Sequence, residues 1–103
     1  MGLYDEDFIL RQIRDFIRSL GRSLALESVL DLYGGANGVD EAVIVQLYYA
    51  EQLTQYLMLS PTSFDLLASQ LGVSEGQLSG LLSANSPIDG PLAHHLANWL
   101  AAL

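Results

Sequence analysis

The sequence contains neither cysteine nor lysine, and its permanent cations are four arginines. Without cysteine the chain has no disulfide, no thiolate metal site and no cysteine nucleophile, a composition that fits a reducing compartment. Long apolar runs are also missing. The longest candidate, residues 42–50, is interrupted by Gln46 and is much shorter than the roughly 18 apolar residues of a membrane-spanning helix. The first residues are acidic and lack the basic region of a secretory signal, so we expect a cytoplasmic protein.

No segment alternates apolar and polar residues with the period of two that a strand needs; apolar residues recur at helical spacing throughout. Half of the 103 residues are apolar, enough for one core that buries roughly two-thirds of the unfolded surface. The expected fold class is therefore all-α, a compact bundle of five to six helices. The spacing predicts helices over residues 5–20, 24–33, 40–58, 64–71 and 75–83, with a last helix after residue 89.

Turn and cap residues mark the boundaries between these helices. Gly34 to Gly38 is the best linker candidate, and it divides the chain into an N-terminal arm, residues 1–33, and a helical domain, residues 40–103. Gly72 is a natural helix end. Ser63, Ser74 and Asp89 are expected to cap the helices that follow them. The helix over 40–58 is apolar around most of its circumference and should be the most buried.

The four arginines all lie in one twelve-residue window. Residues 1–22 contain four acids and four arginines, whereas residues 23–103 contain eight acids and no arginine or lysine. On a helical wheel the arginines face away from an apolar stripe, so the first helix is strongly amphipathic. We take both faces as candidate partner-binding residues: the apolar stripe is Ile9, Ile13, Phe16, Ile17 and Leu20, and the basic face is Arg11, Arg14, Arg18 and Arg22.

Each face of this helix has more than one interpretation. The apolar stripe packs on its own chain or pairs with a second copy as a homodimer, because a soluble monomer does not tolerate a large exposed stripe. The arginine face is either a solvated surface neutralised by Asp7 and Asp15 or a docking site for anionic lipid or an acidic partner. A further option is that the arginines contact the acidic remainder of the chain, in the same molecule or in another subunit.

Residues 63–83 resemble the helix-turn-helix of the lambda-repressor-like (XRE) family. The resemblance is carried by Leu67-Ala68, Leu71-Gly72-Val73-Ser74, Leu78-Ser79 and Leu81-Leu82, and it continues through Pro87-Ile88-Asp89, Leu92-Ala93 and Leu96-Ala97. With the helix before it, the resemblance covers about residues 40–100 and implies repressor-like topology in the C-terminal two-thirds of the chain. The segment from Tyr4 to Arg18 also resembles the opening of a family of small helical bacterial proteins of unknown function.

DNA binding is the function that the repressor-like resemblance implies. The recognition helix would present Gln77 and Ser79 to base edges. However, Phe64 stands where the family usually has a phosphate-contacting glutamine, and residues 40–103 contain six acids and no lysine or arginine. Since phosphate binding is driven by cations, a transcriptional regulator is the alternative function, and the arginine arm or a partner would supply its phosphate contacts.

The sequence predicts no enzyme and no cofactor. His94 and His95 are adjacent, so they point about 100° apart on a helix, and no third metal ligand stands at a helical spacing. The acids are scattered and form no carboxylate pair. The expected function is a non-catalytic protein–protein interaction or oligomerisation module. A third possibility is an acidic protein that uses residues 40–103 to occupy a partner's nucleic-acid site.

Overall fold

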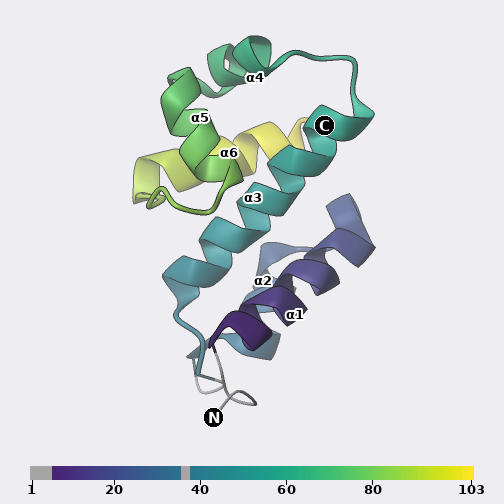
Figure 1. Ribbon diagram of the computed structural model, residues 1–103, viewed down its shortest axis with the longest axis vertical. Coiled ribbons are helices and arrows are strands. Elements are labelled where there is room, and N and C mark those ends of the chain that lie inside the picture. Colours follow the sequence, from purple (N-terminus) through teal and green to yellow (C-terminus); the bar gives the residue numbers. More distant parts are fainter. Residues whose placement is uncertain (1–5, 36–37) are drawn as a thin grey trace.

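Helices make up nearly all of the structure. The computed structural model describes residues 6–35 and 38–103 (Figure 1). These residues form six α-helices and one 3-10 turn: α1 (Glu6–Leu20), η2 (Gly21–Ser23), α2 (Leu26–Tyr33), α3 (Glu41–Leu59), α4 (Phe64–Leu71), α5 (Glu75–Leu82) and α6 (Gly90–Ala101). Within the described ranges there is no strand; Gly34 and Val39 form one isolated bridge. The predicted all-α fold is confirmed, and the predicted helices differ from the observed ones by at most two residues at the described ends.

Local capping explains where four of the helices begin. A side-chain oxygen accepts a hydrogen bond from an N–H of the first turn at each of four positions: Asp40 before α3, Ser63 before α4, Ser74 before α5 and Asp89 before α6. Such a bond satisfies a backbone donor that would otherwise lack an intrahelical partner. Gly72 ends α4 in the left-handed region, with φ of 70°, which glycine adopts without the penalty of a Cβ atom. The caps predicted at Ser63, Ser74 and Asp89 are confirmed.

Helix α3 is the centre of the fold, as its apolar circumference predicted. Figure 1 shows α1 and α2 on one side of α3, and α4, α5 and α6 on the other. Ile44 and Leu53 of α3 are fully buried. Its buried face also includes two polar residues, Glu51 and Gln52, that the wheel did not single out. Because other helices cover α3 on both sides, some of its polar side chains are buried as well.

The first helix packs on its own chain. Ile13 and Ile17 have no exposed surface, and Ile9 and Phe16 pack half-buried against the same cluster. The apolar stripe was expected either to pack on its own chain or to pair with a second copy. In the structure the stripe faces α3 of the same molecule. Leu20 departs from the expectation, because 45% of it is exposed. Leu20 is the last residue of α1. The chain enters the 3-10 turn at the next residue, Gly21, where φ is 57°, so the regular helical geometry that directs Ile13 and Ile17 into the core ends at Leu20.

The second helix begins at Leu26, two residues later than predicted. Leu24 precedes it in extended conformation and is nevertheless buried. Its carbonyl oxygen accepts a hydrogen bond of 2.6 Å from the Tyr48 hydroxyl of α3. This bond ties the link between η2 and α2 to the central helix, which explains why the chain leaves helical geometry there without exposing its apolar side chain.

The C-terminal helices form the second layer against α3. Helices α4 and α5 are joined by the tight turn at Gly72, and Ala68, small where the two helices approach, is buried. Leu78 and Leu81 of α5 face α3, and Leu96 anchors α6. At the far end of α6, Trp99 meets Tyr56 of α3 edge to face, with ring centroids 5.2 Å apart. The end of α6 is thereby held close to the C-terminal end of α3.

Candidate functional site

The arginines of the basic face are exposed, and two of them contact distant parts of the chain. The Arg18 Nε donates to the Glu51 Oε1 of α3 at 2.9 Å. This hydrogen bond and the nearby negative charge raise the pKa of Arg18 above its usual value. Arg22 donates through Nη2 to the Leu103 carbonyl oxygen at 3.1 Å. The basic face therefore meets the acidic remainder of the same molecule at Arg18, which is one of the options that the charge distribution left open.

The other two arginines lie along the exposed side of α1. Arg11 and Arg14 are both exposed. Asp15, proposed to neutralise the basic face, lies close enough to Arg18 to contribute to its raised pKa, after the larger effect of Glu51. The side chain of Asp7 lies outside the part of the chain that the structure describes.

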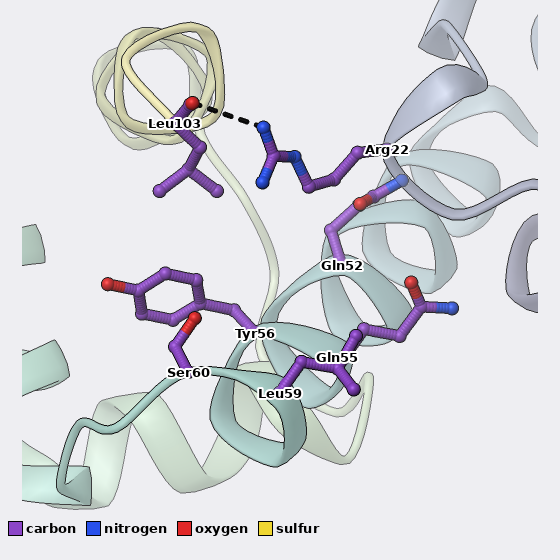
Figure 2. Close-up of a pocket in the computed structure, with 7 residues that line it drawn as sticks. All are labelled: Arg22, Gln52, Gln55, Tyr56, Leu59, Ser60 and Leu103. Atoms are coloured by element: carbon purple, nitrogen blue, oxygen red, sulfur yellow. Dashed lines mark hydrogen bonds between the residues drawn. The ribbon is translucent and has the colours of Figure 1, made fainter.

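A small cleft lies where η2, the second half of α3 and the end of α6 meet. Its volume is about 60 Å³. Figure 2 shows Arg22 and Leu103 along one border, with the side chains of α3 and Ser60 along the others. The cleft is lined by Arg22, Gln52, Gln55, Tyr56, Leu59, Ser60 and Leu103. It combines a cation, two amides and two hydroxyls with an apolar wall, so it can hold a polar group by hydrogen bonds.

Gln52 is the most deeply placed of these residues. It is 2% exposed, and its Nε2 donates to the Gly21 carbonyl oxygen at 2.8 Å. Its Oε1 is buried and has no hydrogen-bond partner among the residues that the structure describes. A buried acceptor without a partner loses the hydrogen bonds that water would make with it, at a cost of about 1–3 kcal/mol.

The outer face of α3 ends in two strongly exposed apolar side chains. Met58 is 77% exposed and Leu59 is 82% exposed. They border a hollow of about 310 Å³ that adjoins the Arg18–Glu51 ion pair and is otherwise lined by Thr54 and Gln55. We call the area formed by Arg18, Arg22, Met58 and Leu59 the α3-end surface. It joins two exposed apolar side chains to two arginines, and arginine is among the residues that contribute most to binding energy in protein interfaces.

The residues proposed to read DNA lie elsewhere. Gln77 and Ser79 are exposed on α5, which Figure 1 shows on the opposite side of α3 from α1. His94 and His95 are exposed on α6. Among the described residues, no group of three or more histidines and acids is placed to hold a metal ion. Helix α1 and helix α5 thus offer two separate surfaces rather than one continuous one.

Sequence reasoning found the arginines of the α3-end surface and missed its apolar half. A signal was present, since Leu57, Met58 and Leu59 are consecutive at a helix end, directly before Ser60-Pro61. Three successive helical residues point about 100° apart and cannot all face one core. In the structure Leu57 is half-buried, whereas Met58 and Leu59 are exposed to solvent. The burial of Gln52 had no comparable signal, because it depends on the residues that cover it.

Comparison with known proteins gives no match: no family model fits the chain, and no curated protein or solved structure is significantly similar to it. The repressor-like topology therefore stays a prediction from residues 40–100, whereas the all-α architecture is observed. None of the described helices has the length and apolar character needed to cross a bilayer.

Proposed function

We propose that this protein is a non-catalytic interaction module that binds an acidic, apolar segment of a partner protein at the α3-end surface. The observation that carries the proposal is the exposure of Met58 and Leu59 beside two arginines. Burying apolar surface against a partner is favourable by about 25 cal/mol per Å². Methionine and arginine are both enriched in protein interfaces, and methionine adapts its shape to different partners.

The charge distribution supports an acidic partner. Every arginine of the chain lies within residues 11–22, and residues 23–103 contain only acids among their permanently charged groups. An acidic segment is therefore repelled by most of the molecule and attracted to residues 11–22. Complementary charge of this kind steers association and fixes orientation more than it raises affinity, so the affinity must come mainly from Met58 and Leu59.

The geometry favours binding over catalysis. Glu51, the carboxylate at the α3-end surface, is almost buried and is held by Arg18. The bond to Arg18 occupies one oxygen of this carboxylate, and burial limits the access of a substrate to the rest of it. The remaining lining groups, amides and hydroxyls, serve to accept and donate hydrogen bonds.

Selection from a random-sequence peptide display library tests the proposal directly. The immobilised full chain is the bait, and peptides are counter-selected on the double variant Met58→Asp, Leu59→Asp. We expect an enriched consensus that mixes aspartate or glutamate with large apolar residues, and we expect these peptides to lose binding to the double variant. Leu66→Asp is the matched control: Leu66 is 56% exposed on α4, and this variant should bind the peptides like the parent.

Four results would overturn the proposal. Selected peptides that bind the double variant equally well, or a basic consensus, would place the interface elsewhere. A dimer lost in the double variant would make a second copy the occupant. Binding of random duplex DNA that weakens steeply with salt, the mark of phosphate contacts, would favour the transcriptional regulator instead.

A further inference from the structure

The side of α3 that packs against α1 continues past the end of α1. Its residues recur at intervals of three and four along the sequence, which places them along one side of a helix. We call this row the α3 seam; it consists of Ile44, Leu47, Glu51, Thr54 and Met58. Ile44 and Leu47 belong to the same buried cluster as Ile13 and Ile17 of α1. The first part of the α3 seam therefore holds α1.

Burial along the α3 seam falls where α1 stops covering it. The first three seam residues are buried, whereas Thr54 is half-buried and Met58 is 77% exposed. Two hydrogen bonds place the last turn of α1 at this point: Arg18 donates to Glu51, and the Gln55 Nε2 donates to the Arg18 carbonyl oxygen at 3.0 Å. Figure 1 shows α3 extending beyond this end of α1. The outer part of the seam thus continues a helix–helix interface, but none of the described helices covers it.

This uncovered part of the seam borders the hollow of about 310 Å³ beside the Arg18–Glu51 ion pair. Side chains of α3 line the hollow, together with Arg18 at the end nearest α1. From Glu51 to Leu59, α3 rises about 12 Å at 1.5 Å per residue. About two turns of a partner helix match this length, and such a helix contacts a groove through residues i, i+3, i+4 and i+7.

A helix suits this surface better than an extended segment. An extended peptide commonly pairs its main chain with the edge of a sheet, and the described ranges of the chain contain no strand. A proline-rich peptide docks on aromatic side chains, and the described residues that line the hollow include none. A helix satisfies its own main-chain N–H and C=O groups. It needs partners only for its side chains, and side chains are what the α3 seam presents.

The cation at the inner end of the hollow favours an acidic residue in that helix. The bond to Glu51 uses the Nε–H of Arg18, which is one of the five N–H donors of a guanidinium. The other four are on the Nη atoms, and 59% of the Arg18 side chain is exposed. A carboxylate that approaches from solvent can therefore accept from the Nη atoms by charge-assisted hydrogen bonds.

We propose that the partner segment is an amphipathic helix that lies on the uncovered part of the α3 seam, in line with α1. Its apolar side chains contact Thr54, Met58 and Leu59, and one of its carboxylates binds the Arg18 guanidinium. The inference rests on the proposed function, because it specifies the conformation of the acidic, apolar segment. It also adds Thr54 to the residues that determine specificity.

Two peptide libraries of identical composition test the inference. In the first, the acidic residue and the large apolar residues stand at helical spacing; in the second, the same residues alternate with polar ones, as in a strand. Both are selected on the immobilised full chain, and the affinities of enriched peptides are measured by fluorescence polarisation. We expect binders from the first library. Methyl labelling of methionine reports where they bind, since the chain has two methionines and one of them is Met58.

Two changes separate a helical occupant from an extended one. A proline at the centre of an enriched peptide should weaken binding about tenfold or more, because proline breaks a helix. Thr54→Glu should also weaken binding about tenfold, because its carboxylate would face apolar and acidic side chains of the peptide. Gln77→Glu is the matched control: it makes the same charge change at an exposed residue of α5, and it should bind like the parent. Melting curves check that both variants are folded, and the proline result needs neither of them.

The inference is overturned if peptides with alternating spacing bind as tightly as the helical ones, if the central proline is tolerated, or if Thr54→Glu binds like Gln77→Glu. The proposed function stands in each of these cases as long as binding still requires Met58 and Leu59. If no peptide binds, or if binding survives in the double variant Met58→Asp, Leu59→Asp, the proposed function fails and the inference fails with it. A protein dimer that dissociates on Thr54→Glu would make a second copy the occupant and would also overturn the inference.

Discussion

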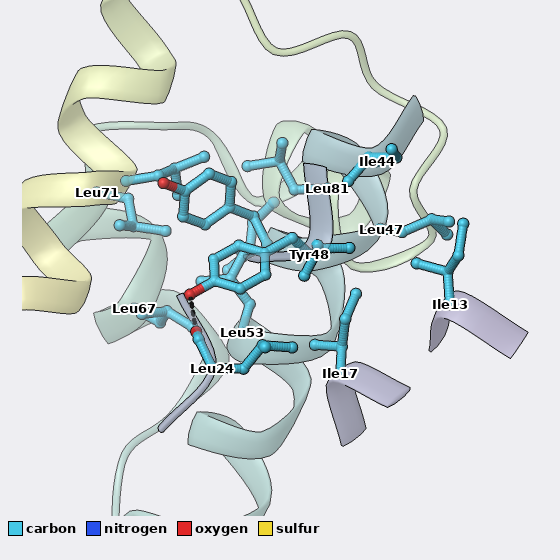
Figure 3. Packing of buried hydrophobic residues seen from close by; sticks show 14 of the residues in the cluster. Ile13, Ile17, Leu24, Ile44, Leu47, Tyr48, Leu53, Leu67, Leu71 and Leu81 are labelled. Carbon is cyan, nitrogen blue, oxygen red and sulfur yellow. Dashed lines mark hydrogen bonds between the residues drawn. The ribbon is translucent and has the colours of Figure 1, made fainter. Parts of the chain in front are cut away.

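Ile17→Ala is the change that most directly tests how α1 is attached to the rest of the protein. Ile17 has no exposed surface, and Figure 3 shows it pointing into the core cluster that also contains Leu47 and Leu53 of α3. The substitution removes three carbon atoms from this cluster. At about 0.8 kcal/mol for each buried carbon, the transfer cost is about 2.4 kcal/mol.

The space left behind adds to this cost, because a packed core closes only partly around a cavity. We therefore expect Ile17→Ala to lower the free energy of unfolding by about 3–4 kcal/mol, within the usual range for such substitutions. A domain of this length has a total stability of about 5–15 kcal/mol. The variant should accordingly stay folded but melt at a much lower temperature.

Urea denaturation followed by far-ultraviolet circular dichroism measures this loss, and it should be run at two widely separated protein concentrations. Packing within one molecule makes the loss independent of concentration. Leu20→Ala is the control: Leu20 belongs to the same stripe but is 45% exposed, so removing its three carbons should cost only about 1.3 kcal/mol. The reasoning is refuted if Ile17→Ala costs no more than Leu20→Ala. It is equally refuted if the parent protein loses stability on dilution, since the stripe would then join two chains.

Three further predictions concern other parts of the structure. In α5, Gly76→Ala should raise the free energy of unfolding by about 0.5 kcal/mol, because alanine loses less conformational freedom on folding than glycine and its Cβ would meet nothing closer than the Ser74 Oγ at 4.0 Å. Gly80→Ala should lower the free energy of unfolding, because its Cβ would collide with the side chain of Ser86. Equal stability of the two variants in urea would contradict the packing of Ser86. A double-mutant cycle with Arg18→Met and Glu51→Gln should give a coupling of about 0.5–1 kcal/mol, small because the Arg18 side chain is 59% exposed; zero coupling would mean that the ion pair is not formed in solution. Burial raises the pKa of Tyr48 and of Tyr49, and for Tyr48 the neighbouring Tyr49 adds to it, so the folded protein keeps protons that the unfolded chain releases near pH 10. Their contribution to stability is therefore complete below about pH 10 and is lost as the pH rises through the folded pKa. Because the chain has five tyrosines, the absorbance of these two is the tyrosinate signal that the double variant Tyr48→Phe, Tyr49→Phe lacks; it should appear together with loss of helicity, and its appearance without unfolding would contradict this.

Much of the helical framework could be predicted because its determinants are local. The capping oxygen of Ser74 acts on an amide three residues away, and Gly72 acts through its own backbone angle. The stripe of Ile13 and Ile17 follows from a repeat of four residues. Each of these effects is present in a short peptide of the same sequence, so it is readable without any knowledge of the fold.

The candidate site could be predicted only in part, because its contacts join distant segments. Arg18 meets Glu51 across 33 residues, and Arg22 meets Leu103 across 81. The cluster of arginines showed where the cations lie, but it did not show which acid or carbonyl each one contacts. The deep burial of Gln52 likewise comes from the turn after α1 and the end of α6, which close over the same part of α3.

The amino-acid sequence by itself determined that this protein is helical, where most helices begin and end, and that all four arginines lie within residues 11–22. It did so because helix period, capping and charge are properties of neighbouring residues. Only the tertiary structure decided that α1 lies against α3 in the same molecule, that Met58 and Leu59 are exposed, and that Gln52 is buried beside a cleft. Each of these outcomes depends on which part of a helix is covered by its neighbours, and the packing of the whole chain decides that.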